Sequence, residues 1–181
     1  TSVKEIVLCD SKGIIYDGRG DLNEFKRQMA KITNGKKRQG TLKDALRGAD
    51  VFIGVSKGNL LTANDLKVMN KGAIVFAMAN PTPEIMPSEA AKVAAVVGTG
   101  RSDFPNQINN SLGFPGIFRG ALDSKATQIN NEMKIAAANA LAKCVEPTKD
   151  NILPYTLDKS VVPKVAAAVA KAAKESGVCR E

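Results

Sequence analysis

The sequence contains no histidine and no tryptophan, and aromatic residues make up only 4% of its 181 residues. The lack of histidine excludes a histidine metal site, a histidine-based catalytic triad and a histidine general base in this chain. Because aromatic residues are so few, we expect a core of valine, isoleucine, leucine and alanine. Such a core suits a parallel sheet that is covered by helices rich in small residues.

Cysteine is also scarce, since only Cys9, Cys144 and Cys179 are present and they lie far apart. An odd number of widely spaced cysteines argues against a disulfide framework and a zinc site, and it favours a reducing compartment. No apolar run reaches the length that crosses a membrane, and the first residues lack a signal-peptide pattern. We therefore predict a cytoplasmic protein with no membrane partner.

The charge balance is basic, with 26 lysine and arginine residues against 18 aspartate and glutamate residues, so the net charge is +8. Such a charge attracts phosphates, acidic partners or nucleic acid. One basic run, Lys36-Lys37-Arg38, lies in a polar loop. Because aromatic residues are few and no nucleic-acid-reading motif is present, we interpret this run as solvated and predict no nucleic-acid partner.

Short apolar runs alternate with stretches of helical periodicity along the chain. Spacing and capping signals predict helices near residues 21–33, 41–49, 62–72, 123–145 and 161–175. The apolar runs predict strands over residues 3–10, 51–56, 73–79 and 94–97. Apolar strands separated by helices indicate a parallel sheet. The sequence therefore predicts an α/β fold, a Rossmann-like doubly wound parallel sheet with C-terminal helices, in one domain over residues 1–181.

In doubly wound sheets, ligands bind at the carboxyl ends of the strands, so candidate functional residues are sought there. Asp10 ends the first predicted strand. An acid at this place in a dinucleotide fold accepts hydrogen bonds from the adenosine ribose and repels a 2′-phosphate, which favours NAD over NADP. The alternative is that Asp10 only caps the turn that follows it.

The next two strand ends carry small and amide side chains. Gly54 lets a nucleotide ring lie against the backbone, and Val55 and Ser56 follow it. Asn80 precedes two prolines that hold it at the sheet edge, where its amide suits a carboxamide or a hydroxy-acid. A tight turn and a structural loop amide explain these residues about as well.

The fourth predicted strand is followed by Gly98 and Gly100, and then by the paired amides Asn109 and Asn110. Glycines permit the close approach of a ligand to the backbone. The two amides lie ahead of a predicted Pro-Gly turn at residues 115–116, a combination that favours ligand binding over turn formation.

One element of a Rossmann domain is missing from the pattern. A strand, the fingerprint G-x-G-x-x-G and a helix are expected about 30 residues ahead of the acid that ends the second strand. Here that acid is Asp10, and no such fingerprint occurs. We therefore expect the fold to be incomplete at its N-terminus and to lack the helix end that holds the pyrophosphate.

Several long motifs resemble, in the same order, the C-terminal part of malic enzymes, particularly the compact bacterial kind. They include Asn80-Pro81-Thr82-Pro83-Glu84 and Arg101-Ser102-Asp103-Phe104-Pro105-Asn106, and they cover residues 8–16, 48–56, 76–87, 99–110, 114–123 and 161–173. The resemblance extends over essentially the whole chain. It implies oxidative decarboxylation of malate to pyruvate and carbon dioxide, with reduction of NAD, or of NADP as a second possibility, and with Mg²⁺ or Mn²⁺ as the metal.

The resemblance also implies roles in cofactor binding. Asp10 contacts the adenosine ribose, and Val55 and Ser56 line the cofactor cleft. Asn80 lies beside the nicotinamide ribose and malate, and Asn109 and Asn110 face the nicotinamide and the malate carboxylates.

For the substrate, the resemblance implies that Asn80 and Asn110 bind malate. The catalytic tyrosine and lysine of the family, and its acidic metal ligands, lie in segments that precede the matched region. We therefore assign no catalytic residue and no metal ligand in this chain, and neither Tyr16 nor Tyr155 lies in a matching motif. We expect the chain alone to be inactive and to need its N-terminal half or a partner chain, in a homodimer.

Other classes of protein remain open. A dehydrogenase that acts on amino acids is disfavoured by the motifs at residues 80–84 and 101–106. A non-catalytic NAD-binding module, or a truncated remnant of a malic enzyme, fits the missing fingerprint.

Overall fold

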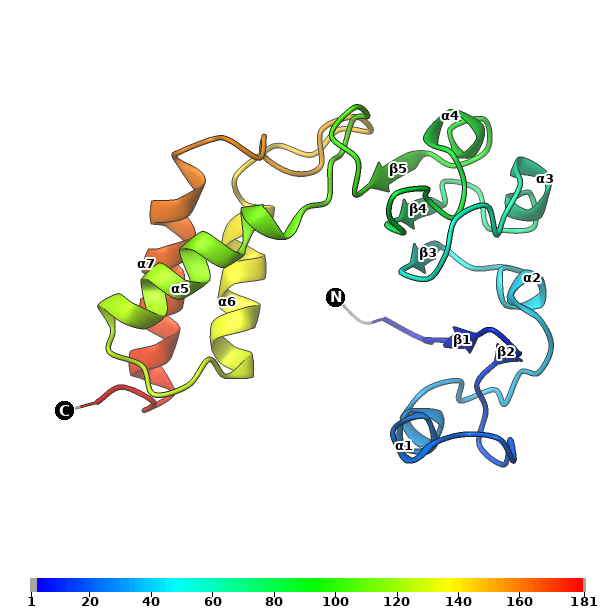
Figure 1. Cartoon of the computed structure of the whole chain (residues 1–181), viewed down its shortest axis with the longest axis horizontal. Coiled ribbons are helices and arrows are strands. Elements are labelled where there is room, and N and C mark those ends of the chain that lie inside the picture. The colour runs from blue at the N-terminus through cyan, green and yellow to red at the C-terminus, as the bar shows by residue number, and fades with distance from the viewer. Residues whose placement is uncertain (1–2, 181) are drawn as a thin grey trace.

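The computed structural model describes residues 3–180, in which an α/β part is followed by a group of C-terminal helices (Figure 1). Residues 1, 2 and 181 of the predicted domain lie outside the described residues. Figure 1 shows the sheet with its helices on one side of the molecule and the helices α5, α6 and α7 on the other.

The α/β part is built on a parallel sheet of three strands in the order β3–β4–β5. The strands are β3 (Val51–Gly54), β4 (Ile74–Ala77) and β5 (Val96–Thr99). The predicted Rossmann-like α/β class is confirmed. Three of the predicted strands, over residues 51–56, 73–79 and 94–97, are confirmed within two residues at each end.

Three short helices cover one face of this sheet: α2 (Leu42–Ala45), α3 (Ala63–Leu66) and α4 (Pro87–Ala90). Two begin with a capping box, as predicted, because Thr41 and Thr62 exchange hydrogen bonds with the acid three residues later. The core beneath them is aliphatic apart from one phenylalanine. Its central members are Leu46, Phe52, Leu66, Val75, Ala77, Ile85 and Ala90.

The opposite face of β3 is bare. Val51 and Ile53 alternate with the buried Phe52 and Gly54, and they are 46% and 61% exposed. Because side chains of a strand alternate between two faces, this pattern means that one face of β3 packs on the helices and the other is largely open to solvent.

The predicted strand over residues 3–10 is wrong for most of its length. Only β1 (Cys9–Asp10) forms a strand, and it pairs antiparallel with β2 (Gly13–Ile14) outside the parallel sheet. A strand needs a hydrogen-bonded neighbour, and residues 3–8 have no ladder partner in the part of the chain that is described. The helix that follows, α1 (Glu24–Ile32), confirms the prediction for residues 21–33 and is capped by Asn23.

The C-terminal part contains the short 3₁₀ helix η1 (Asn110–Leu112) and three α-helices: α5 (Phe114–Asp123), α6 (Asn131–Ala142) and α7 (Val161–Glu175). The prediction for α7 is confirmed. The single helix predicted over residues 123–145 is wrong in its first part, because the chain turns between α5 and α6. The predicted Pro-Gly turn at residues 115–116 is also wrong, since α5 begins there. Pro115 lies in the first turn, where its missing N–H costs no helical hydrogen bond.

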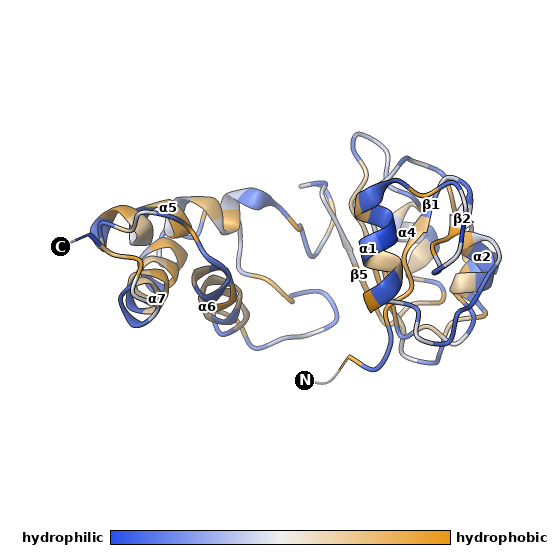
Figure 2. Ribbon diagram, turned by 90° about the horizontal axis from the view of Figure 1, so that it is seen from below, coloured by the Kyte–Doolittle hydropathy of each residue, from blue (hydrophilic) through white to orange (hydrophobic). Residues whose placement is uncertain are grey.

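Two glycines let α5 pack closely on α7. A Cβ atom on Gly116 would lie 2.6 Å from Val165 Cβ, and one on Gly120 would lie 2.5 Å from the carbonyl oxygen of Ala166. Figure 2 shows hydrophobic residues along the facing parts of these helices, and Val165, Val169 and Met133 are completely buried between them and α6. The glycines therefore serve helix packing rather than a turn.

We expect Gly120→Ala to lower the free energy of unfolding by about 1–3 kcal/mol, because the added methyl group overlaps backbone of α7 and overpacks the core. Urea denaturation followed by circular dichroism measures the change. Gly20→Ala is the control, since no atom lies within 4 Å of a Cβ placed there. An unfolding free energy of Gly120→Ala equal to that of the control variant would contradict the packing described.

Candidate functional site

The carboxyl ends of β3, β4 and β5 lie at one edge of the sheet. Gly54 is aligned with Ala77, and Ala77 with Thr99, so the residues that follow these three emerge side by side. Asn80 from the loop after β4 contacts Gly100 after β5, because a Cβ on Gly100 would lie 3.2 Å from Asn80 Nδ2. The structure thus brings together strand ends that are far apart in the sequence.

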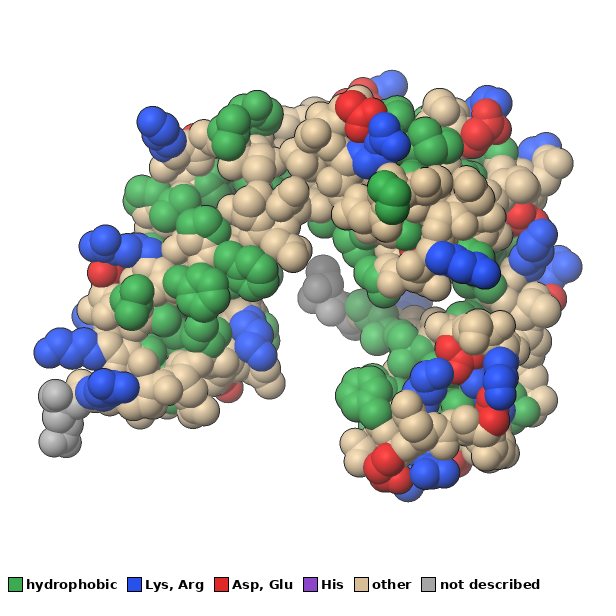
Figure 3. Space-filling model, viewed as in Figure 1, with side chains coloured by type: hydrophobic (Ala, Val, Ile, Leu, Met, Phe, Trp, Pro, Cys, Tyr) green, Lys and Arg blue, Asp and Glu red, His purple; other side chains and the backbone are tan. Residues whose placement is uncertain are grey.

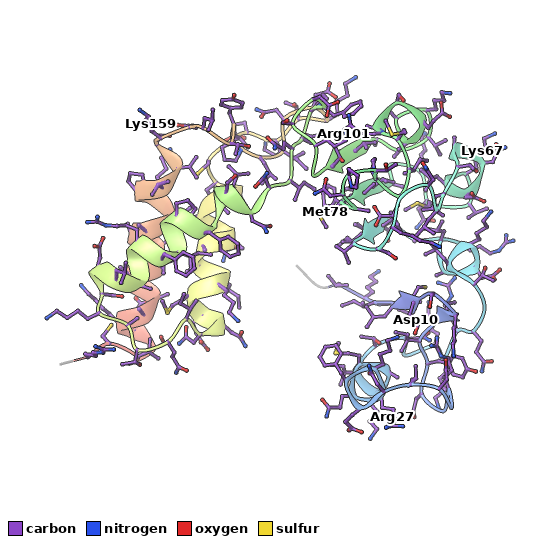
Figure 4. The ribbon with its side chains drawn as sticks, in the orientation of Figure 1. Asp10, Arg27, Lys67, Met78, Arg101 and Lys159 are labelled. Carbon is purple, nitrogen blue, oxygen red and sulfur yellow. The ribbon has the colours of Figure 1, made fainter. Side chains whose placement is uncertain are left out.

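Three of the predicted site residues lie at this edge and are open to solvent. Val55 and Ser56 follow β3, and Asn80 follows β4 after Met78, which Figure 4 labels at the strand end. The side chain of Val55 is 76% exposed, and it continues the exposed face of β3 that carries Val51 and Ile53. Apolar and polar groups are therefore both available to a ligand here.

A buried carboxylate, which the sequence analysis did not single out, lies beneath these loops. The backbone N–H of Ser56 donates to Glu84 Oε1 (2.8 Å), and that of Ala79 donates to Glu84 Oε2 (3.1 Å). Glu84 itself is completely buried. The only sequence signal was an acid placed directly after a proline-rich loop, which by itself is typical of many solvent-exposed turns.

The second residue that sequence reasoning missed is Asn106, which is also buried. Its Nδ2 donates to the carbonyl oxygens of Val97 (2.9 Å) and Lys149 (2.7 Å), and its Oδ1 accepts from the N–H of Ile152 (3.0 Å). The φ angle of Asn106 is 56°, a left-handed conformation that asparagine tolerates. It fixes the segment that leads from β5 to the paired asparagines.

Asn109 and Asn110 stand at the start of η1, and both are exposed. Gln107 forms a parallel bridge with Thr99, so this segment returns along the end of β5 before it reaches them. Asn109 Oδ1 accepts from the N–H and the hydroxyl of Ser111, both at 2.9 Å. Its carbonyl oxygen thus caps the helix, and its Nδ2 is the group that can donate to a ligand.

Asp10 lies apart from these residues, at the end of β1 (Figure 4). Its Oδ2 accepts from Arg19 Nη2 and Lys26 Nζ, each at 2.6 Å, and its Oδ1 accepts from the N–H of Lys12 at 3.0 Å. The last bond confirms that Asp10 caps the turn between β1 and β2. The structure gives no contact between Asp10 and Val55, Ser56 or Asn80 among the described residues, so its predicted contact with a ribose stays a prediction.

The two cations change the chemistry of Asp10. The hydrogen bond from the Arg19 guanidinium, followed by that from the Lys26 ammonium, holds the pKa of Asp10 well below its ordinary value of 3.8. Lys12 and Arg19 likewise lower the pKa of the neighbouring Asp21 to about 2. Burial, together with the charge of Asp10, raises the pKa of Cys9 to about 11, so this thiol is protonated at neutral pH and is a poor nucleophile.

We expect Asp10→Asn to destabilise the fold by about 2 kcal/mol at pH 7, because hydrogen bonds to two cations are lost or weakened. Since folding lowers the pKa of Asp10, the unfolded state binds more protons as the pH falls below 3.8, and the stabilisation is lost there. The difference in unfolding free energy between wild type and variant should therefore shrink between pH 4 and pH 2.

Urea titrations across this pH range measure the difference. Asp123→Asn is the control, because the Arg119–Asp123 pair is exposed and contributes little. A difference between wild type and Asp10→Asn that is independent of pH would contradict the ion-pair account.

Neither a metal cluster nor a membrane span is found in the described part of the chain. No group of three or more aspartate, glutamate or cysteine side chains within residues 3–180 is placed to hold a metal ion. None of the described helices is long and apolar enough to cross a membrane. A cavity of about 330 Å³ lies between residues 3–6 and 32–36, away from the strand ends that carry the candidate site.

A parallel sheet with exposed polar and small residues along its carboxyl edge defines a Rossmann-like nucleotide-cofactor domain. The chain belongs to the malic enzyme family: residues 1–174 match the family described as "Malic enzyme, NAD binding domain". The predicted family is thereby confirmed.

Individual relatives agree with this assignment. The chain is 57% identical to the bifunctional malic/malolactic enzyme of Bacillus subtilis over 183 residues, which is 98% of this chain and 45% of the relative. It is 47% identical to the NAD-dependent malic enzyme of Geobacillus stearothermophilus, covering 99% of this chain and 38% of the relative. An NADP-dependent malic enzyme of Escherichia coli is 45% identical, with 96% of this chain and 25% of the relative covered.

Solved structures give the same result. The crystal structure of the NAD-dependent malic enzyme from Thermotoga maritima superposes with a TM-score of 0.90 at 43% identity, over 93% of this chain and 45% of that one. The chain thus spans less than half the length of each of these relatives.

Proposed function

We propose that this chain is the cofactor-binding part of an enzyme that oxidatively decarboxylates (S)-malate to pyruvate and carbon dioxide and reduces NAD or NADP. The observation that carries the proposal is that the loops with Ser56, Asn80 and Gly100 leave the aligned carboxyl ends of three parallel strands at one sheet edge. The names of the relatives, which are NAD- and NADP-dependent malic enzymes, support it.

In this proposal the strand ends hold the cofactor and orient it. Val55 and Ser56 line the cleft, and the exposed Val55 side chain gives the ring an apolar surface. Asp10 binds the adenosine ribose, and Asn80 lies between the nicotinamide ribose and malate. When bound, the nicotinamide accepts hydride from C2 of malate.

The paired asparagines complete the site. Asn109 Nδ2 donates toward the nicotinamide, since its Oδ1 is engaged by Ser111. Asn110 donates an amide hydrogen to a malate carboxylate. Neither residue transfers a proton; both position a group at the end of β5.

The bare side of β3 supports a further part of the proposal, namely a preceding segment or a partner chain that adds a strand and a helix. A strand pairs in parallel with the free edge of β3, and a helix covers Val51 and Ile53, which are now 46% and 61% exposed. Figure 3 shows an open recess between the sheet and the lower part of the molecule, where such a unit fits. Relatives more than twice as long as this chain have residues to supply it.

We assign to that same part the glycine fingerprint, the catalytic tyrosine and lysine, and the ligands of Mg²⁺ or Mn²⁺, because none of the matched motifs contains them. The described residues offer no acidic cluster that fits the metal, so no step of the reaction is assigned to it here. We also propose that the complete enzyme is a cytoplasmic homodimer. The exposed stripe of Phe114, Phe118 and Leu122 along α5 is a surface that the rest of the protein can cover.

NAD is the proposed cofactor, with NADP accepted as well. The carboxylate of Asp10 would repel a 2′-phosphate if it stood alone. Because Arg19 and Lys26 both pair with it, that repulsion is offset, and discrimination against NADP is weak.

We expect Lys26→Ala to shift the cofactor preference toward NAD, lowering the ratio of kcat/KM for NADP to that for NAD by about tenfold, the effect of one lost hydrogen bond between charged groups. Steady-state kinetics of the complete enzyme with both cofactors measure this ratio. Lys171→Ala is the matched control, because Lys171 pairs with Glu175 on α7, in the C-terminal group of helices. An unchanged ratio in Lys26→Ala would mean that the 2′-phosphate of NADP does not bind near Asp10 and Lys26.

The function itself is tested by joining the chain to a segment of a relative. We expect the chain alone to show no malate-dependent reduction of NAD. When it is joined to the part of the Bacillus subtilis relative that precedes the matched region, NADH should form with malate and a divalent metal, and Asn110→Ala should raise the KM for malate at least tenfold.

The joined protein also separates this proposal from a simpler one. If it folds and binds NADH but does not oxidise malate, a non-catalytic NAD-binding module is the better account.

A further inference from the structure

Glu84 is a fully buried acid in the loop that follows β4. Acidic side chains are seldom completely buried unless they are paired. No cation is paired with Glu84 in the described residues; instead, its two oxygens accept backbone N–H groups from two different loops. The side chain therefore connects segments of the backbone rather than neutralising a charge.

The backbone of Glu84 strengthens this connection. Its carbonyl oxygen accepts from the N–H groups of Leu60 (2.8 Å) and Leu61 (3.0 Å), which lie in the loop after β3. The side chain reaches the same loop at Ser56 and its own loop at Ala79. One residue thus holds both ends of the loop after β3 to the loop after β4.

The close approach depends on a glycine. A Cβ atom on Gly54 would lie 2.5 Å from Glu84 Cδ and 2.7 Å from Glu84 Oε1. Only a residue without a side chain at the end of β3 leaves room for the carboxylate. The glycine at this place therefore accommodates Glu84, in addition to any access that it gives a ligand.

We propose that Glu84 is a positioning residue that sets the distance between the cofactor and malate. The inference rests on the proposed function. Ser56 is a cofactor-lining residue, and Ala79 immediately precedes Asn80, which lies between cofactor and substrate. Because both N–H groups bind to one rigid carboxylate, Ser56 and Asn80 keep a fixed separation. A displacement of about 1 Å at a reacting centre can lower a rate by a factor of about 100.

Three substitutions disturb this arrangement in different ways. Glu84→Gln keeps the shape but turns an NH₂ group toward one of the two N–H donors, so one hydrogen bond is replaced by repulsion. Glu84→Asp is one methylene shorter and cannot reach both donors. Gly54→Ala keeps the glutamate, but the added methyl group displaces the Glu84 carboxylate from the end of β3.

The test uses the active enzyme assembled from this chain and its preceding part, and it combines kinetics with amide NMR. In Glu84→Gln we expect kcat per NADH-binding site to fall about 100-fold, while the KM values for NAD and malate change less than fivefold. The amide proton resonances of Ser56 and Ala79 should both move upfield, one because its hydrogen bond is lost and the other because a neutral amide oxygen is a weaker acceptor than a carboxylate. Normalising kcat to binding sites removes the effect of any unfolded fraction, which a merely structural role would produce. Glu89→Gln, an exposed acid on α4, is the control and should leave kcat unchanged.

A Glu84→Gln enzyme with kcat within threefold of wild type overturns the proposal, and so do unshifted Ser56 and Ala79 resonances. If Glu84→Gln does not fold, Glu84→Asp and Gly54→Ala are measured in its place. We expect the same 100-fold fall in kcat in these variants, and a kcat within threefold of wild type would overturn the proposal. If the wild-type enzyme neither binds NADH nor oxidises malate, the proposed function is contradicted. If the wild-type enzyme is active and substitution of Glu84 leaves kcat unchanged, only the positioning role of Glu84 is contradicted.

Discussion

The structure depends on the parallel register of β3, β4 and β5. Because the three strands run in the same direction and end at aligned residues, the loops that follow them meet at one edge. Asn80 and Gly100 are far apart in the sequence, and this register brings them together. The helices on one face stabilise the register by burying Phe52, Val75 and Ala77, and the bare edge of β3 is the place at which a further parallel strand extends it.

Polar side chains, rather than regular secondary structure, hold the loops at that edge. Glu84 binds the backbone after β3 and β4, and Asn106 binds the backbone of β5 and of the loop near residue 150. Each is buried, so breaking its hydrogen bonds leaves backbone groups without partners and costs more than the loss of a surface contact. The loops can therefore be irregular in shape and still hold functional side chains firmly.

The sequence predicted those features that depend on neighbours along the chain. Apolar runs located β3 and β4, and Thr41 and Thr62 predicted two capping boxes that are present. It misplaced features that depend on distant contacts. Residues 3–8 form no ladder without a partner strand, and Gly116 of α5 was interpreted as part of a turn because its packing partner, α7, is more than 40 residues away.

In the candidate site, too, the features that depend on neighbours along the chain were predicted and those that depend on distant contacts were not. The sequence placed Val55, Ser56 and Asn80 at strand ends, where the structure also has them, because apolar strands can be read from the sequence; their roles in binding, and those of Asn109 and Asn110, stay predictions. Glu84 and Asn106 were not found, because their hydrogen bonds join residues 28 and 43 positions apart. Hydrogen–deuterium exchange of the complete enzyme, with and without NADH, tests the central claim that these strand ends form one cofactor site. We expect NADH to slow exchange together in residues 54–58, 78–82, 99–101 and 109–111. Protection confined to other segments, or to only one of these four, would contradict the account.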